Sequence, residues 1–235
     1  MGEIRPQVDE SQLKARFHLQ IYSAYVGFGI LENTSNVRDA LDNSLGSGEG
    51  AFGSEDFLRF DMDSKQLSGG LFSIPLSGFE NITIPGAVLA SSNPNKWKLL
   101  GNSLSVPACQ KAFLDVEKRL IVCSVEPTIP DFHHVKLSAV STGVNLIFRG
   151  NHYAGFVLSD PLALLPNADR PTLISDYRIL SAFFWPHNDD VFEHILCDDD
   201  DALKAYYKGL EAALGNYTSS DTLTAKLFKN AFAFG

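Results

Sequence analysis

Apolar and polar residues alternate along residues 13–22, which is the pattern of a half-buried β-strand. The apolar face carries Leu13, Ala15, Phe17, Leu19 and Ile21, and the opposite face carries Lys14, Arg16, His18, Gln20 and Tyr22. We expect a strand there, with His18 on its solvent-facing side. The pattern runs on into residues 25–30, where Gly27 and Gly29 indicate a bulge or a close approach of another backbone segment.

Short apolar runs separated by turn residues continue from residue 57 to residue 160. They span residues 57–62, 71–76, 82–90, 98–106, 113–116, 120–125, 135–140, 144–149 and 153–158. Strands this close in sequence pair mostly as antiparallel meanders, and the separation of 113–116 from 120–125 predicts a compact hairpin. The chain also contains 17 Phe, a residue enriched in strands. These patterns predict a meander-rich antiparallel β-sheet, either sandwich-like or barrel-like.

Two of the expected hairpin segments resemble each other, residues 60–75 and residues 114–127. Each has an acidic residue, then a Lys, then a Leu before an apolar strand that ends in Pro. The match is short, and a shared hairpin geometry explains it without a duplication.

Helical spacing of apolar residues dominates the second part of the chain. It predicts helices over residues 172–185, 201–214 and 221–232, although the aromatic second half of the first also suits a strand. A short helix is expected earlier, over residues 36–45, with Asn36 as its N-cap. We therefore predict an α+β fold. Its mainly β part covers residues 1–160, its mainly α part covers residues 161–235, and its C-terminal helices pack against the sheet in one compact unit.

The acidity of the chain is mostly one local feature. The net charge is −9, from 28 acidic and 19 basic residues. Seven acidic residues fall within one short segment that holds no Lys or Arg: Asp189, Asp190, Glu193, Asp198, Asp199, Asp200 and Asp201. Without them, 21 acidic residues remain against 19 basic ones. The chain therefore lacks the basic excess of a general nucleic-acid binder or of a protein that docks on anionic lipid. A basic protein partner or a cation is the electrostatically favoured ligand.

The cysteines and the apolar runs predict the cellular compartment of the protein. Cys109, Cys123 and Cys197 are odd in number and widely spaced, which indicates reduced thiols in the cytoplasm. The first 16 residues are polar and charged, unlike a secretory signal, and no apolar run approaches the ~20 residues that span a bilayer. We expect a cytoplasmic protein that is not embedded in a membrane.

The acidic segment also contains groups that bind transition metals. If it is helical, Asp190, His194 and Cys197 share one face, and His187 lies just before them. The spacing matches no established metal motif, with neither HExxH nor an EF-hand loop. Residues 198–201 also stand at the start of an expected helix, where carboxylates satisfy free N–H groups and the helix dipole. We assign no metal and no cofactor, and leave open whether these four residues converge.

Two other stretches suggest chemistry. His133 and His134 follow Asp131 at the mouth of an expected strand, and Cys109 is a further candidate nucleophile. The chain has no GxSxG elbow and no local cysteine-protease signature. Within the glycine-rich residues 46–53, Gly48, Gly50 and Gly53 satisfy GxGxxG literally. The stretch follows an expected helix and enters an expected strand, however, which is the reverse of a dinucleotide site. We interpret it as a linker loop.

The leading hypothesis is a non-enzymatic binding or regulatory protein that presents the acidic segment to a basic protein partner. Immunity proteins and inhibitors of nucleic-acid-directed toxins use the same electrostatics, which makes them an analogy of mechanism. The alternative is a hydrolase-like small-molecule enzyme with a His/Asp site at the junction of sheet and helices. Its candidates are His133, His134 and the pair His187 and His194. A metal-binding protein is a third hypothesis.

Overall fold

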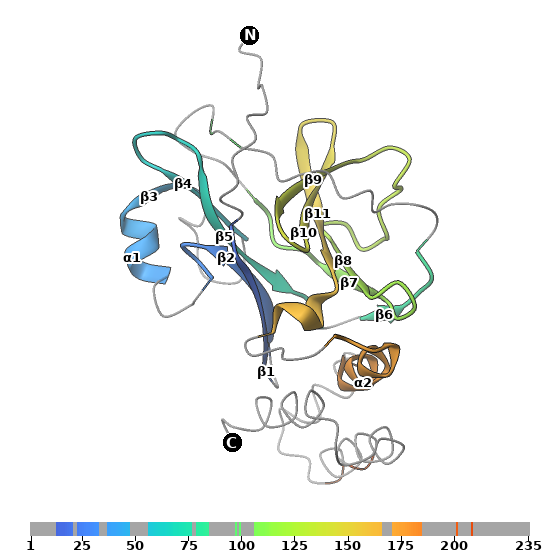
Figure 1. Cartoon of the computed structure of the whole chain (residues 1–235). Helices are drawn as coiled ribbons and strands as arrows, with labels where there is room; N and C mark the ends of the chain where they lie inside the picture. The colour runs from blue at the N-terminus through green and yellow to red at the C-terminus, as the bar shows by residue number, and fades with distance from the viewer. Residues whose placement is uncertain are drawn as a thin grey trace.

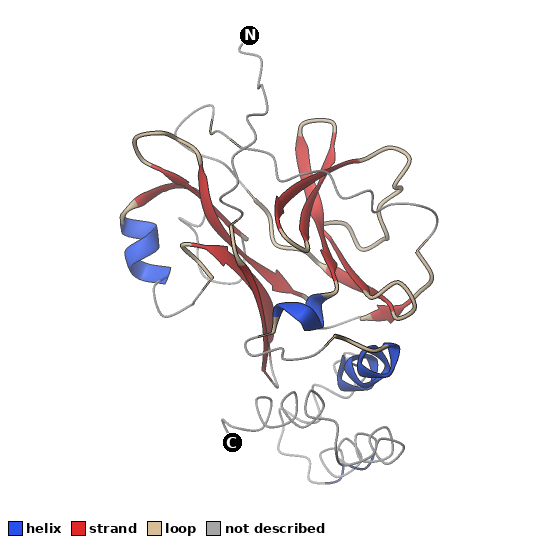
Figure 2. Cartoon of the chain, in the orientation of Figure 1, coloured by secondary structure: helices blue, strands red, loops and turns tan. Residues whose placement is uncertain are grey.

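The described part of the molecule contains two β-sheets, a helix at one end of them and two shorter helical elements (Figure 1). The computed structural model describes residues 13–20, 23–32, 37–47, 56–76, 79–84, 97, 99, 106–165, 171–184, 201 and 208. The predicted α+β class and the mainly antiparallel pairing are confirmed. The described strands form two separate sheets and do not close into a barrel (Figure 2).

The first sheet has the strand order β1-β2-β5-β4-β3, and all neighbouring strands in it are antiparallel. Its strands are β1 (Ala15–Gln20), β2 (Ser23–Gly29), β3 (Ser44–Gly46), β4 (Phe57–Asp61) and β5 (Leu67–Ile74). A short helix, α1 (Val37–Asp42), precedes β3. The alternation predicted for β1 is confirmed, because Ala15, Phe17 and Leu19 are buried and Lys14 is exposed.

The second sheet has the order β6-β7-β8-β11-β10-β9, with β6 and β7 parallel and the other neighbours antiparallel. Its strands are β6 (Glu80–Asn81), β7 (Lys111–Asp115), β8 (Leu120–Ser124), β9 (Lys136–Ser141), β10 (Val144–Arg149) and β11 (His152–Ser159). The expected hairpin of β7 and β8 is confirmed. Every residue of β8 is buried, as expected for a central strand covered on both faces.

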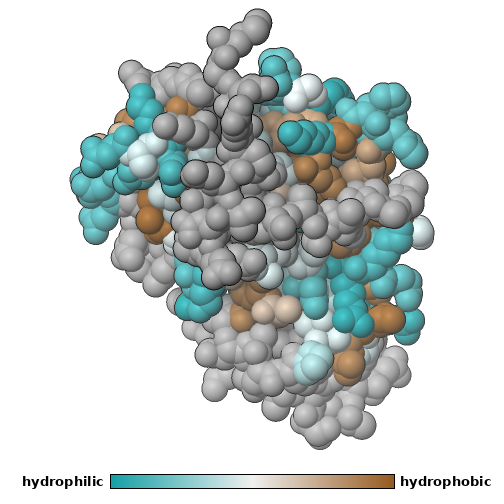
Figure 3. Space-filling view, turned by 45° about the horizontal axis from the view of Figure 1, so that its top comes forward, coloured by the Kyte–Doolittle hydropathy of each residue, from teal (hydrophilic) through white to brown (hydrophobic). Residues whose placement is uncertain are grey.

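The two sheets share one apolar core. The first sheet contributes Phe17, Val26, Phe28 and Phe72, and the second contributes Leu114, Ile121, Leu146 and Phe156. The rings of Phe72 and Phe156 meet with centroids 5.0 Å apart, which joins the sheets directly. Burying a side chain of this kind stabilises the fold by about 1.5–3 kcal/mol. Polar side chains cover much of the outside of the described part, with smaller apolar areas between them (Figure 3).

Two helical elements follow the last strand. A 3-10 helix, η2 (Pro161–Leu164), leads toward α2 (Ile174–Phe184), so the expected helix over residues 172–185 is confirmed and the strand alternative is wrong. Tyr177, Ile179 and Leu180 of α2 are buried. Leu173 lies just before the helix, and its side chain is 50% exposed. Its amide donates to the Asp176 carboxylate at 2.7 Å where the helix begins.

Two expected boundaries in the first sheet are wrong. The helix expected over residues 36–45 ends earlier, at Asp42, and Leu45 belongs to β3. Near this helix end, the buried Arg59 donates a hydrogen bond to the carbonyl of Leu41. Strand β5 begins at Leu67, before the run expected over residues 71–76, and it includes Gly69 and Gly70. These glycines permit close packing: a Cβ on Gly70 would lie 2.6 Å from the Phe28 ring.

The two similar segments do share a turn geometry. The Asp61 carboxylate accepts from the Ser64 amide at 2.7 Å, and the Asp115 carboxylate accepts from the Lys118 amide at 2.9 Å. The next residue is left-handed in both turns, Lys65 with φ 55° and Arg119 with φ 57°. The sequence likeness therefore corresponds to one kind of hairpin turn used once in each sheet.

Candidate functional site

The acidic segment lies almost entirely outside the described residues. Asp189, Asp190, Glu193, Asp198, Asp199 and Asp200 fall there, as do His187, His194, Cys197 and the helix expected over residues 221–232. Of the helix expected over residues 201–214, only Asp201 and Lys208 are described, and both are helical and exposed. The partner-binding surface and the convergence of His187, Asp190, His194 and Cys197 on a metal therefore stay predictions.

The described residues lack two other kinds of feature. They include no group of three or more His, Cys, Asp or Glu side chains placed to hold a metal ion. No helix within the same ranges is long and apolar enough to cross a bilayer.

The structure brings together two of the residues singled out for catalysis. In the loop between β8 and β9, His134 Nδ1 lies 2.7 Å from Asp131 Oδ2, and the His133 amide donates to Asp131 Oδ1 at 3.0 Å. The hydrogen bond from His134 holds the pKa of Asp131 below its usual value. The pair is open to solvent, with the side chains 78% and 58% exposed. Water therefore screens this contact strongly.

His18 is less exposed than its strand position predicted. Its ring stacks on Tyr25 with centroids 4.7 Å apart, and its Nε2 lies 3.0 Å from the Glu32 carbonyl oxygen. Burial holds the pKa of His18 below its usual value. The Glu32 carboxylate in turn pairs with Arg16 and, at 3.7 Å, with Lys14. These contacts attach residues 30–32 to the outer face of the first sheet, so we assign His18 a structural role.

The third described candidate, Cys109, belongs to a buried polar cluster where the two sheets meet. Its Sγ lies 3.9 Å from the Tyr153 hydroxyl, and that hydroxyl donates to Asp56 Oδ2 at 3.2 Å. Asp56 directly precedes β4 and is 1% exposed. Its other oxygen, Oδ1, accepts from the Ser73 amide at 2.9 Å. Cys109 is therefore joined to Asp56 and Tyr153 rather than to Asp131 or a histidine.

The electrostatics of this cluster follow from its burial. Burial raises the pKa of Asp56 to about 7, although hydrogen bonds from Ser73, Tyr153 and the Cys109 amide oppose the shift. Burial also raises the pKa of Tyr153 and of the Cys109 and Cys123 thiols well above their usual values. A buried neutral thiol is a poor nucleophile, so the cluster does not suit cysteine catalysis. Asp56 is the member that exchanges a proton near neutral pH.

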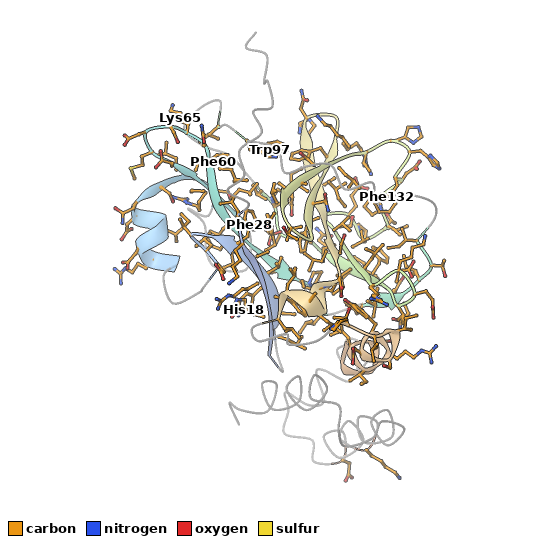
Figure 4. All side chains as sticks on the ribbon, viewed as in Figure 1. His18, Phe28, Phe60, Lys65, Trp97 and Phe132 are labelled. Carbon is orange, nitrogen blue, oxygen red and sulfur yellow. The ribbon has the colours of Figure 1, made fainter. Side chains whose placement is uncertain are left out.

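Aromatic rings surround the Tyr153 end of the cluster. Tyr153 stacks on Phe72 with centroids 6.2 Å apart and meets the edge of Phe148 at 6.4 Å. Phe148 in turn stacks on Trp97 with centroids 4.8 Å apart. Trp97 and Phe28 both pack against the core between the sheets (Figure 4). The indole Nε1 of Trp97 is buried and has no hydrogen-bond acceptor within the described part of the chain.

The junction of sheet and helix, where a His/Asp site was expected, holds a different network in the described part. Asp160 Oδ1 accepts from the Thr172 hydroxyl at 2.6 Å and from the Tyr177 hydroxyl at 2.5 Å. Arg119 donates to the same Thr172 hydroxyl at 3.4 Å. Burial and the adjacent Asp160 carboxylate raise the pKa of Tyr177. With Tyr177 fully buried, this network attaches α2 to the second sheet.

Sequence reasoning missed Asp56 and Tyr153. An acidic residue that follows a glycine-rich loop and precedes a strand is ordinarily a turn residue on the surface. The apolar pattern correctly predicts that Tyr153 lies in a strand, but the position of its hydroxyl depends on a contact with Asp56, 97 residues away. Neither residue carries a local signal of this contact.

Comparison of the chain with protein-family models, curated proteins and solved structures finds no match.

Proposed function

We propose that the protein is a non-enzymatic binding or regulatory protein whose acidic segment, residues 189–201, binds a basic protein partner. The observation that carries the proposal is the concentration of charge. Seven of the 28 acidic residues lie in this segment, which contains no Lys or Arg. Such a surface attracts a cationic partner and accelerates its association, as in immunity proteins and toxin inhibitors.

Several carboxylates of the described surface pair with cations of the same chain. Glu80 pairs with Lys111 at 2.7 Å, and Glu126 pairs with Arg149 at 2.5 Å. Glu32 pairs with Arg16 and Lys14. Residues 189–201 contain no Lys or Arg of their own. This local concentration of one charge sign is the reason we propose the segment as the surface for a basic partner.

The proposal includes a location and excludes two partner classes. We propose that the protein works in the cytoplasm, which fits the free thiols of Cys109 and Cys123. Nucleic acid and anionic membrane surfaces are not proposed as partners, because both would be repelled by a chain with a net charge of −9.

A neutralisation experiment tests the proposal. A partner captured at low salt is purified, and its affinity is measured for the natural chain and for a variant with Asp198, Asp199, Asp200 and Asp201 changed to Asn. We expect the affinity to fall by about fourfold to several hundredfold, since each of the four lost charge contacts contributes about 0.2–1 kcal/mol.

A matched control removes the same charge elsewhere. It changes four exposed acidic residues, Asp42, Asp63, Glu117 and Glu126, to their amides. We expect this variant to bind as the natural chain does. Equal affinity of all three proteins would show that the acidic segment does not form the binding surface.

The second candidate is a hydrolase-like enzyme, and one observation favours it. The 2.7 Å contact of His134 Nδ1 with Asp131 Oδ2 is the arrangement in which a carboxylate orients an imidazole base. Turnover of a panel of small ester substrates by the natural chain, and its loss in His134→Gln, would favour the enzyme. Equal rates in both proteins would contradict it.

A further inference from the structure

The Asp56 carboxylate lies where three separate pieces of the chain meet. Its Oδ1 accepts from the Ser73 amide of β5, in the first sheet, and its Oδ2 accepts from the Tyr153 hydroxyl of β11, in the second. The Cys109 amide, just before β7, is its third donor. One carboxylate therefore links the two sheets and the segment that leads into β7.

The backbone of Asp56 fixes the same position. Its amide donates to the Val106 carbonyl at 2.8 Å, and its carbonyl accepts from the Ser47 hydroxyl at 2.9 Å. The Ser47 hydroxyl also accepts from the Leu58 amide at 2.8 Å. Because the main chain is held on both sides, the carboxylate cannot easily turn toward water.

The groups that face Asp56 are uncharged. They are Tyr153 from β11, Cys109 from the segment before β7, Cys123 from β8 and the Ser73 amide from β5. The nearest cation along its own strand, Arg59, has its guanidinium bound to Ser44 and to the carbonyls of Leu41 and Ser47. No ion pair to Asp56 exists among the described residues, so ionisation would leave a buried charge supported by hydrogen bonds alone.

We propose that Asp56 is a proton-operated clasp between the two sheets: the neutral carboxyl holds them together, and its ionisation loosens their contact. The hydrogen-bond chain allows both states. When Asp56 is ionised, the Tyr153 hydroxyl donates to it. When Asp56 is protonated, it donates to the Tyr153 oxygen across the same 3.2 Å, and the Tyr153 hydroxyl turns toward Cys109 Sγ at 3.9 Å.

The direction of the effect follows from linkage. Folding raises the pKa of Asp56 from its ordinary 3.8 to about 7, so the folded protein binds this proton more tightly than the unfolded chain does. The stabilisation is complete below the ordinary pKa and is lost as the pH rises through about 7. Between pH 3.8 and about 7, this group raises the equilibrium constant for unfolding by up to roughly tenfold per pH unit.

Carbon-13 NMR titration of the side-chain carboxyls of the full chain tests the proposal directly. We expect the Asp56 signal to titrate between pH 6 and 8, and titration below pH 5 would overturn the clasp. In Tyr153→Phe, which removes a hydrogen bond that lowers this pKa, the midpoint moves upward. An unchanged midpoint would overturn the role of Tyr153 in the clasp.

Urea unfolding at several pH values tests whether the ionisation of Asp56 destabilises the fold. Subtracting the pH dependence of Asp56→Asn from that of the natural chain isolates the contribution of this group. We expect the equilibrium constant for unfolding of the natural chain to rise by up to tenfold more per pH unit than that of Asp56→Asn, and this difference in slope to vanish above pH 7. Asp61→Asn, which changes an exposed turn carboxylate, retains the dependence of the natural chain above pH 5. Equal slopes for the natural chain and Asp56→Asn would contradict the clasp.

Discussion

Replacing Tyr177 with phenylalanine removes one hydroxyl from the junction of α2 and the second sheet and leaves the ring in place. That hydroxyl donates to Asp160 Oδ1 at 2.5 Å and accepts from the Leu162 amide at 3.3 Å. Tyr177 is fully buried, so water does not replace the lost partners. The substitution therefore measures how strongly this network holds the helix that leads into the acidic segment.

The size of the effect follows from the two lost contacts. A hydrogen bond to a charged acceptor contributes about 1.5–3 kcal/mol, and a buried amide left without an acceptor costs about 1–3 kcal/mol. The Thr172 hydroxyl still donates to Asp160, which reduces the first loss. We expect a net destabilisation of about 2 kcal/mol. For a chain of 235 residues this lowers Tm by about 4–8 °C.

Urea denaturation followed by circular dichroism measures the change. The control is Arg178→Ala on the same helix, because Arg178 is 66% exposed and meets Glu117 only at 3.9 Å. We expect the control to lose less than about 0.5 kcal/mol. If Tyr177→Phe unfolds at the same urea concentration as the control, the network does not hold α2 and the reasoning is refuted.

Two further outcomes are expected from the same structure. Gly29 and Gly150 both have φ 61°, but a Cβ on Gly29 would lie 2.1 Å from the Ser68 carbonyl oxygen, whereas nothing lies within 4 Å of one on Gly150. Gly150→Ala should therefore cost only about 1 kcal/mol and Gly29→Ala at least about 2 kcal/mol more in urea denaturation; equal costs would contradict the close strand contact. Cys109 and Cys123 should resist alkylation in the native protein and react after unfolding, as located by mass spectrometry, because both thiols are buried with raised pKa values. Rapid native labelling of either would contradict the buried cluster.

The parts of the fold that sequence predicts well are those set by local periodicity. Strand β1 alternates because every second side chain faces the core, and β10 spans residues 144–149 as expected. For residues 172–185 the sequence is compatible with both a helix and a strand, since the aromatic residues suit both structures. In the helix, Tyr177 forms hydrogen bonds with Asp160 and Leu162, and no local sequence pattern predicts these contacts.

The parts that sequence misses depend on contacts between distant residues. Gly69 and Gly70 resemble turn residues, but they lie within β5, where the Phe28 ring packs against Gly70 and the backbone of Phe28 and Ile30 lies against Gly69. Asp56 resembles a surface turn residue, but it is buried and bonded by Ser73 of β5, Tyr153 of β11 and Cys109 of the segment before β7. The charge of the acidic segment, by contrast, is visible in the sequence alone, because it requires no contact.

The salt dependence of partner binding tests the central claim most directly. The dissociation constant of the purified partner complex is measured from about 50 to 500 mM NaCl, a range over which the screening length falls severalfold. We expect the affinity of the natural chain to weaken steeply with salt, and the affinity of the variant with Asn at residues 198–201 to weaken much less. The same salt dependence in both proteins would contradict binding through the acidic segment.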